Sequence, residues 1–257
     1  TFNSLLSAPG SIDRFSRIVD DYVALENSFQ GINLSTGMVF GLVRYRDVNT
    51  NVFGYVRYVV PNSSAETSGI TRGMYFNTVN GTQITDTNYR DLLFSDATSF
   101  SLGLADFNAG NPTANNTTAS LSKTEIQENP IAISKIIEDG SKKIGYFLYN
   151  QFSSSYDQSL NAAFNTFKMG AIDDLIIDLR YNSGGSTRTA SYLGSMVTGQ
   201  FSEEVYSKEV WNSKVTNAFS ADDFINIFPT RITKTDGNNT IVVDEAIHSL
   251  NLQRVYF

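Results

Sequence analysis

The sequence predicts a chain of α/β plus β class with more than one domain. Its 257 residues exceed the roughly 150 residues of an average domain. β-Branched and aromatic residues crowd residues 38–60, whereas residues 143–197 alternate the patterns of buried strands and amphipathic helices. The first pattern favours antiparallel strands, and the second favours a βαβα unit with a parallel sheet.

The composition excludes several classes of protein and site. Lys and Arg total 19 and Asp and Glu total 26, so the net charge is −7, which argues against a nucleic-acid binder. Cysteine is absent and His248 is the only histidine, so disulfides, cysteine nucleophiles and metal sites built on several Cys or His are excluded. We expect neither a metal nor a cofactor. No apolar run reaches the roughly 18 residues of a membrane span, so we expect no transmembrane segment in this chain.

The first 37 residues are predicted to form a helical segment. Apolar side chains recur at helical spacing between residues 11 and 29, and Ser11 is a candidate cap. We expect a small docking helix.

Residues 38–107 are predicted to form a strand-rich domain. The expected elements are strands at 39–45 and 52–60, a short helix at 65–68, a strand at 74–79, a helix at 87–94 and a strand at 100–104. Asn80-Gly81 is the strongest two-residue hairpin signal in the chain. Residues 108–120 lack large apolar side chains, which predicts a surface loop, either a hairpin tip or a linker. Residues 108–142 are therefore interpreted as a linker with connecting strands.

Residues 143–257 are predicted to form an α/β domain. The expected elements are a strand at 144–149, a helix at 156–169 stopped by Gly170, a strand at 175–179, a turn at 181–185, a helix at 187–197, and strands at 205–211 and 250–257. A strand in such a pattern normally leads into a loop and a helix. Because the last strand lacks both, we expect the domain to continue beyond Phe257.

The turn with Gly184 and Gly185 is the most informative stretch. It follows a buried strand and precedes a helix, and glycines adopt backbone conformations that point successive N–H groups outward. Such a turn holds a phosphate or an oxyanion, or is simply tight, and the residues leave these alternatives open. The glycine spacing matches no nucleotide-binding fingerprint.

No convincing nucleophile accompanies this turn. Ser183 and Ser186 flank the glycines without forming a nucleophile elbow, and a single His248 is more often structural than catalytic. Lysines are interpreted as solvated at four positions: Lys168, Lys208, Lys214 and Lys234. Asp173-Asp174 is interpreted as an exposed turn. The residues thus offer a candidate oxyanion site but no convincing nucleophile to act beside it.

Three segments in this order resemble the C-terminal-processing (tail-specific) serine proteases that carry a PDZ domain, a bacterial family. Asp13-Arg-Phe-Ser16 resembles the motif before the PDZ domain. The segment from Pro61 to Gly73, followed by Val79-Asn-Gly81, resembles the PDZ signature, with departures at Ser68 and Met74. Leu175-Ile-Ile-Asp-Leu-Arg-Tyr-Asn-Ser-Gly-Gly185 resembles the protease core motif, and this match is the most specific.

The resemblance implies a PDZ-like β-barrel with short helices at 38–107 and an incomplete protease core at 143–257. It implies that the backbone N–H of Gly184 or Gly185 binds the oxyanion. The family's nucleophilic serine and catalytic lysine follow a strand like 252–257, so neither is expected within this chain. The PDZ groove binds a substrate's C-terminal carboxylate, which by position falls at Phe40, Gly41, Leu42 and Val43.

The function predicted from the sequence is therefore a serine endopeptidase that cleaves by Ser/Lys acyl transfer and acts on peptides or unfolded proteins with free C-termini. This chain alone is expected to be inactive. The alternative is a non-catalytic peptide-binding scaffold made of a PDZ domain and a protease-like domain. The resemblance and the composition predict a periplasmic or cell-envelope location, and a lipid anchor in the full-length protein is one option.

Overall fold

The computed structural model describes residues 2–8, 11–13, 16, 18–19, 21–30, 32–108 and 110–257. The chain divides into two compact units, Thr1–Glu128 and Asn129–Phe257. The boundary falls inside the segment 108–142, for which the sequence predicts a linker and connecting strands. Both units combine strands with helices, so the mixed α/β character is confirmed.

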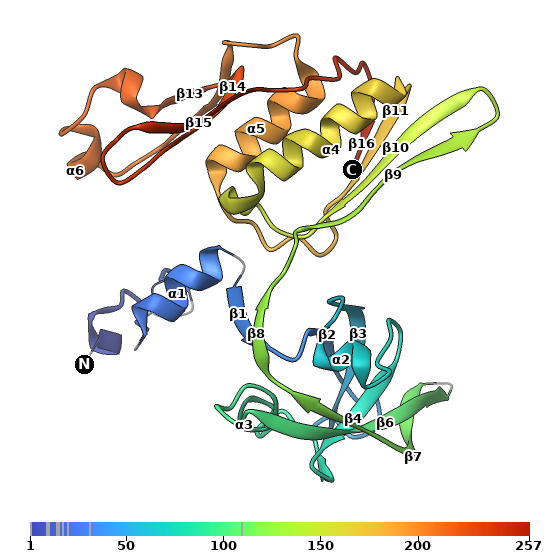
Figure 1. The fold of residues 1–257 in the computed structure, drawn as a ribbon. Coiled ribbons are helices and arrows are strands. Elements are labelled where there is room, and N and C mark those ends of the chain that lie inside the picture. Colours follow the sequence, from blue (N-terminus) through green and yellow to red (C-terminus); the bar gives the residue numbers. More distant parts are fainter. Residues whose placement is uncertain are drawn as a thin grey trace. The chain divides into compact units, whose positions relative to one another are not determined.

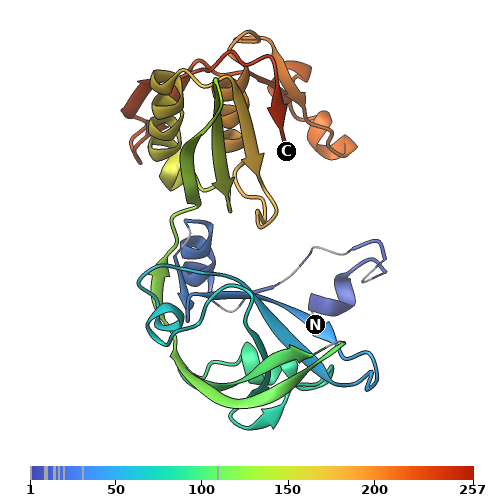
Figure 2. The ribbon, with the colours of Figure 1, turned by 90° about the vertical axis from the view of Figure 1, so that its right-hand side faces the viewer.

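The first unit is built on a six-stranded antiparallel sheet (Figures 1 and 2). Its strands are β2 (Met38–Arg44), β3 (Val52–Val59), β4 (Tyr75–Val79), β5 (Thr82–Gln83), β6 (Ser99–Asn108) and β7 (Asn111–Ser122). They follow the order β2-β3-β4-β6-β7, with β5 paired to β4. Among the described residues no pairing joins β7 back to β2. The predicted barrel is therefore corrected to an open sheet.

The core of this unit is formed by side chains from the strands and from the two short helices α2 (Ser64–Thr67) and α3 (Tyr89–Leu93). Phe76 is fully buried at its centre, and its ring lies where a side chain on Gly54 would have to go. The hairpin predicted at Asn80-Gly81 is confirmed, because both residues have positive φ and join β4 to β5.

The segment 108–120 is mostly strand rather than loop. β7 pairs with β6 along nearly its whole length, and the connection between the two strands is short. β7 contributes backbone hydrogen bonds and a few inward-facing side chains to the sheet. Small residues such as Ala119 are sufficient for these inward positions. The absence of large apolar residues was therefore a poor signal for a loop.

The N-terminal helix is shorter than predicted. α1 spans Tyr22–Phe29, and the Asp21 side chain caps it by accepting a hydrogen bond from the Ala24 N–H at 3.0 Å. Ser11 caps no helix and donates to the Ala8 carbonyl instead. The motif Asp13–Ser16 includes residues 14 and 15, which lie outside the described residues. A 3₁₀ helix, η1 (Phe2–Leu5), and the strand pair β1 (Ile32–Ser35) and β8 (Thr124–Gln127) complete the unit.

The second unit contains a four-stranded sheet in the order β16-β11-β10-β9. The strands are β9 (Ile131–Asp139), β10 (Lys142–Tyr149), β11 (Asp174–Asp178) and β16 (Val255–Tyr256). β10, β11 and β16 run parallel, and β9 is antiparallel to β10. α4 (Asp157–Gly170) connects β10 to β11, and α5 (Thr187–Thr198) follows β11 (Figure 1). The structure thus contains the βαβα unit predicted from the sequence.

The end of α4 differs in one detail from the prediction. The residue in the left-handed conformation is Ala171 (φ 50°), not Gly170. Gly170 is still helical, and a Cβ there would lie 2.2 Å from the Ile136 side chain of β9. Its glycine is explained by this close approach rather than by helix termination.

Two two-stranded ribbons extend this unit. One pairs β12 (Val205–Lys208) with β13 (Ile225–Ile227), and the other pairs β14 (Arg231–Thr235) with β15 (Ile241–Ala246). Short helical turns fill the connections: η2 (Ser154–Tyr156), α6 (Ser213–Thr216) and η3 (Ala221–Phe224). In the part of the chain that the structure describes, no helix is both long and apolar enough to cross a membrane.

Candidate active site

The turn after β11 is held by the side chain of Asn182. Its amide group donates to the Tyr149 carbonyl at 3.0 Å, which ties the turn to the end of β10. Its Oδ1 atom accepts a hydrogen bond from the Gly184 N–H at 2.7 Å. Asn182 therefore fixes the turn from within, in the manner of an Asx turn.

Phe152 holds the same turn from outside. The Phe152 N–H donates to the Gly184 carbonyl, and the Phe152 carbonyl accepts from the Ser186 N–H, both at 2.8 Å. Gly185 lies between these two bonds with φ 132°, a conformation that side chains rarely adopt. A Cβ on Gly185 would also lie 2.2 Å from the Phe152 carbonyl oxygen, so the site requires glycine on two grounds.

The structure distinguishes the two predicted oxyanion donors. The Gly184 N–H is occupied by Asn182. The Gly185 N–H has no hydrogen-bond partner among the described residues, and Gly185 is exposed. It lies two residues before α5, whose N-terminus carries a partial positive charge. Of the two glycines, Gly185 is thus the one that offers a free donor to an anion.

Ser186 caps α5 rather than acting beside a base. Its Oγ accepts a hydrogen bond from the Thr189 N–H at 3.2 Å. Ser183 is exposed, with its N–H bonded to the Asn150 carbonyl. The His248 N–H is bonded to Asn161 in α4. The hydrogen bonds found for these residues join neither serine to His248.

An ion pair stands at the carboxyl end of β11. The Arg180 guanidinium donates two hydrogen bonds to one Asp178 oxygen, at 2.6 and 3.0 Å, and the Tyr146 hydroxyl donates to the same oxygen at 2.8 Å. Arg180 lowers the pKa of Asp178 to about 2, so this carboxylate stays ionised near neutral pH. Both residues lie within the core motif at 175–185, although the sequence alone predicts no role for them.

A second carboxylate lies beneath the turn and was missed by sequence reasoning. Asp157, the first residue of α4, is buried and accepts a hydrogen bond from the Thr189 hydroxyl at 2.7 Å. Lys234 of β14 lies 3.9 Å from it, so the interpretation of this lysine as solvated was wrong. The acid at the start of a predicted helix was the only sequence signal, because Lys234 comes from a distant segment of the chain.

Asp174 also differs from its predicted setting. It is buried rather than exposed, and it accepts hydrogen bonds from Arg254 at 2.8 and 3.0 Å and from Lys142 at 3.0 Å. Arg254 lowers the pKa of Asp174 below its usual range. The carboxylate thereby clips β16 and β10 to β11, far along the strand from the turn.

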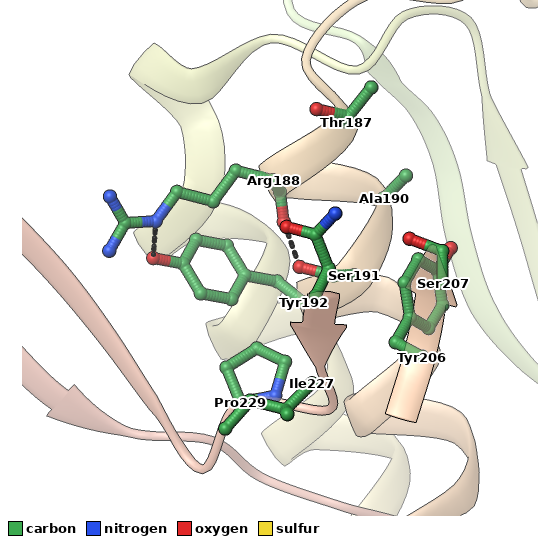
Figure 3. A pocket seen from close by; sticks show the side chains of 10 residues that line it. Thr187, Arg188, Ala190, Ser191, Tyr192, Tyr206, Ser207, Ile227 and Pro229 are labelled. Carbon is green, nitrogen blue, oxygen red and sulfur yellow. Dashed lines mark hydrogen bonds between the residues drawn. The ribbon is translucent and has the colours of Figure 1, made fainter. Parts of the chain in front are cut away.

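Two cavities flank α5, one beside its first turns and the other along the rest of the helix. One has a volume of about 450 Å³ and is lined by hydroxyl groups, an amide, aliphatic side chains and the rings of Tyr192 and Tyr206 (Figure 3). Its only charged lining residue is Arg188, whose guanidinium donates to the Tyr192 hydroxyl at 2.8 Å. The other cavity, of about 490 Å³, is more apolar and includes Phe152 and Leu179 beside the turn. Ala190 and Tyr206 line both cavities.

In the first unit, the predicted peptide-binding residues lie at a free sheet edge. β2 is the terminal strand of its sheet, so its outer edge has no strand partner within the described ranges. Leu42 and Val43 line a groove of about 360 Å³ beside Tyr89 of α3. Phe40 instead contacts the buried Phe76 ring edge to face and the exposed Phe94 ring at a tilt, and Gly41 lies under the ring of Tyr55. An Arg44–Asp86 ion pair of 3.2 Å borders the groove.

Across the described residues, no cluster of three or more His, Cys, Asp or Glu side chains is arranged to hold a metal ion.

Comparisons with known proteins find similar solved structures and a family match for part of the second unit. An S41 protease of Bacteroides fragilis has a similar structure, with a TM-score of 0.58 and 24% identity over 87% of this chain. This chain spans 62% of that structure's length. A photosystem II D1 C-terminal processing protease matches with a TM-score of 0.41 and 19% identity, over 65% of this chain and 45% of its own.

A PDZ-domain protein of Parabacteroides distasonis matches with a TM-score of 0.28 and 10% identity, over 82% of this chain and 48% of its own. No curated protein sequence matches the chain significantly. Residues 143–249 match the family model of peptidase family S41, which includes both the turn and its supporting strands. Residues 143–249 therefore form a peptidase family S41 domain.

Proposed function

We propose that this chain is part of a serine-type endopeptidase of the C-terminal-processing kind. The observation that carries the proposal is the unoccupied Gly185 N–H, held at the N-terminus of α5 in an S41 domain. A fixed N–H donor at this position suits the oxyanion that develops when a nucleophile attacks a peptide carbonyl.

The chemistry of this turn is electrostatic. A tetrahedral intermediate carries a negative charge on the former carbonyl oxygen, and a preorganised donor stabilises that charge without rearranging. One such donor contributes roughly 10²–10³ in kcat. The bonds from Asn182 and Phe152 keep the turn in place before substrate arrives. The two cavities beside α5 offer room for substrate side chains on either side of Tyr206.

The nucleophile and base belong to the proposal by resemblance to the family. They are a serine and a neutral lysine that follow a strand equivalent to β16. Residues 1–257 supply the oxyanion part of the site, and we expect them alone to be inactive. A second N–H donor is expected from the residue after that serine.

The groove beside β2 completes the proposal as the place where substrate C-termini bind. A peptide added to the free edge of β2 would lie between Leu42–Val43 and α3. The substrates are then peptides or unfolded proteins with free C-termini, and we place the enzyme in the periplasm or cell envelope. Without the catalytic pair, the same architecture serves as a non-catalytic peptide-binding scaffold, which is the alternative.

The deciding experiment compares two proteins on unfolded β-casein. The chain of residues 1–257 is expected to leave casein intact. The natural full-length protein is expected to cleave it if its sequence carries Ser-x-Ser-x-Glu and a later lysine. Absence of cleavage by the full-length protein favours the scaffold. Cleavage by residues 1–257 that disappears in Ser186→Ala or His248→Ala contradicts the assigned nucleophile.

A further inference from the structure

Three polar side chains from three separate elements meet behind the oxyanion turn. Asp157 begins α4, Thr189 lies in the first turn of α5, and Lys234 comes from β14. The Thr189 hydroxyl donates to Asp157 Oδ1 at 2.7 Å, and Lys234 Nζ lies 3.9 Å from Asp157 Oδ2. Lys234 also donates to the Ser154 carbonyl, which ties β14 to the segment before α4.

The carboxylate sits in an environment that disfavours its charge. Asp157 is 3% exposed, and burial raises its pKa, which Thr189, Lys234 and Arg188 partly counteract. Tyr149 of β10 is fully buried, and its pKa is raised by burial first and by the charge of Asp157 second. Burying a carboxylate costs free energy unless hydrogen bonds or opposite charges compensate for the lost water. For Asp157 that hydrogen bond comes from the Thr189 hydroxyl.

A short chain of bonds leads from Thr189 to Gly185. The Thr189 N–H donates to the Ser186 hydroxyl at 3.2 Å, and the Ser186 N–H donates to the Phe152 carbonyl at 2.8 Å. That carbonyl oxygen lies 2.2 Å from the place that a Cβ on Gly185 would take. The same residue, Thr189, is therefore held by the carboxylate on its side chain and holds the turn through its backbone.

We propose that Asp157 is a positioning residue for the oxyanion donor: through the Thr189 hydroxyl it fixes the first turn of α5, and with it the direction of the Gly185 N–H. The inference rests on the proposed function, in which that N–H binds the oxyanion. Asp157 does not touch substrate in this scheme and takes no proton from it.

The test uses residues 1–257 and two backbone measurements by NMR. Asp157→Ala and Thr189→Val are each expected to speed hydrogen exchange of the Ser186 N–H about tenfold or more, because the buried hydrogen bond between the two side chains is lost. Exchange of the Phe164 N–H in α4 reports global opening and is expected to change far less. The double variant is expected to match the stronger single variant, and Thr189→Ser is expected to behave as wild type.

A pH titration tests whether Asp157 positions the Gly185 N–H or only stabilises the fold. The Gly185 amide resonance is expected to follow the ionisation of Asp157 in the wild type and to lose this dependence in Asp157→Asn. Asp178 titrates near pH 2 and is thereby distinguished. Asp174→Asn, which neutralises a buried carboxylate at the start of β11, away from the turn, is the matched control and is expected to leave both signals unchanged.

Unchanged Ser186 protection in folded Thr189→Val, or a Gly185 resonance indifferent to Asp157, overturns the proposal. Thr189→Val keeps the shape of the side chain, so it decides the matter even where Asp157→Ala does not fold. Neither measurement involves cleavage. A negative NMR result therefore does not contradict the peptidase proposal. A negative casein experiment does not change what the NMR measurements say about Asp157.

Discussion

The carbonyl oxygen of Phe152 occupies the place that a side chain on Gly185 would need. An ideal Cβ on Gly185 would approach that oxygen to 2.2 Å, whereas one on Gly184 would meet nothing within 4 Å. Both glycines have positive φ, so they differ in packing and not in backbone class. This difference separates the cost of backbone strain from the cost of displacing Phe152.

The first prediction compares alanine at the two glycines. Gly184→Ala is expected to cost about 1–2 kcal/mol of unfolding free energy, from strain alone. Gly185→Ala is expected to cost about 2–4 kcal/mol, because the Phe152 carbonyl and its bond to Ser186 must move as well. Urea unfolding followed by circular dichroism measures both. Equal losses contradict the assigned role of Phe152.

The same pair of variants separates structure from catalysis in an active, full-length protein. Gly185→Ala is expected to lower kcat by roughly 10²–10³ at nearly unchanged peptide affinity, since the oxyanion donor is displaced. Gly184→Ala is expected to lower kcat much less, because its N–H is already bonded to Asn182. A folded Gly185→Ala variant with full kcat shows that the turn is structural only.

A third prediction concerns acid. The pKa of Asp178 is lowered from 3.8 to about 2 by Arg180, so the native state favours its ionised form. The stability it contributes is present above about pH 4 and is lost as the pH falls through 2. The Tm difference between wild type and Asp178→Asn is expected to shrink over this window.

The pKa of Asp157 is shifted in the opposite direction, so this residue serves as the control for the titration of Asp178. The pKa of Asp157 is raised by burial, so the native state binds its proton more tightly than the unfolded state does. Its contribution is present at low pH and is lost as the pH rises through the native pKa. A Tm difference for Asp157→Asn with the same pH trend as Asp178→Asn contradicts these assignments.

The sequence predicted the parts of the fold that depend on local pattern. Strand 144–149, the helix after it and the glycine turn before α5 were recognisable because apolar periodicity and turn residues coincide there. β7 was missed because its side chains are small and its role is set by the partner strand β6. The start of α1 was placed too early because apolar spacing continues upstream of the true cap, Asp21.

The site divides in the same way. Gly184 and Gly185 could be named from their residue type, yet their different roles depend on the position of Asn182 Oδ1. Asp157 and Lys234 are 77 residues apart in sequence (234 − 157) and meet only through the packing of α4 and β14. Asp174 was predicted to lie in an exposed turn because its partner Arg254 is 80 residues away in sequence and meets it only in the folded chain.

A fourth prediction addresses this Asp174–Arg254 contact, which attaches β16 to the sheet. β16 pairs with β11 through only two residues, Val255 and Tyr256, so the ion pair is a large part of its attachment. Asp174→Asn is expected to speed hydrogen exchange of the Val255 and Tyr256 amides. Arg231→Gln, which breaks an exposed pair with Asp244, is the control and is expected to leave them unchanged. Unaltered exchange in Asp174→Asn shows that strand pairing and the packing of Val255 hold β16 without the ion pair.

The last prediction concerns peptide binding beside β2. A peptide with an apolar C-terminus is expected to bind residues 1–257 with a Kd on the order of micromolar, since a short added strand buries little surface and must be ordered. The free backbone N–H groups at the outer edge of β2 are expected to bind the carboxylate. The amidated peptide should therefore bind at least about tenfold more weakly, as measured by calorimetry.

Two lysine variants locate this binding on the molecule. Val43→Lys places a charged chain in the groove that Val43 lines with Leu42 and Tyr89, and it is expected to weaken binding of the free-acid peptide strongly. Val48→Lys makes the same change at an exposed position that does not line the groove, so it is expected to bind as wild type. Equal affinity for the acid and the amide removes the carboxylate from the recognition. Equal effects of the two substitutions contradict binding beside β2, because only Val43 lies where an added strand would run.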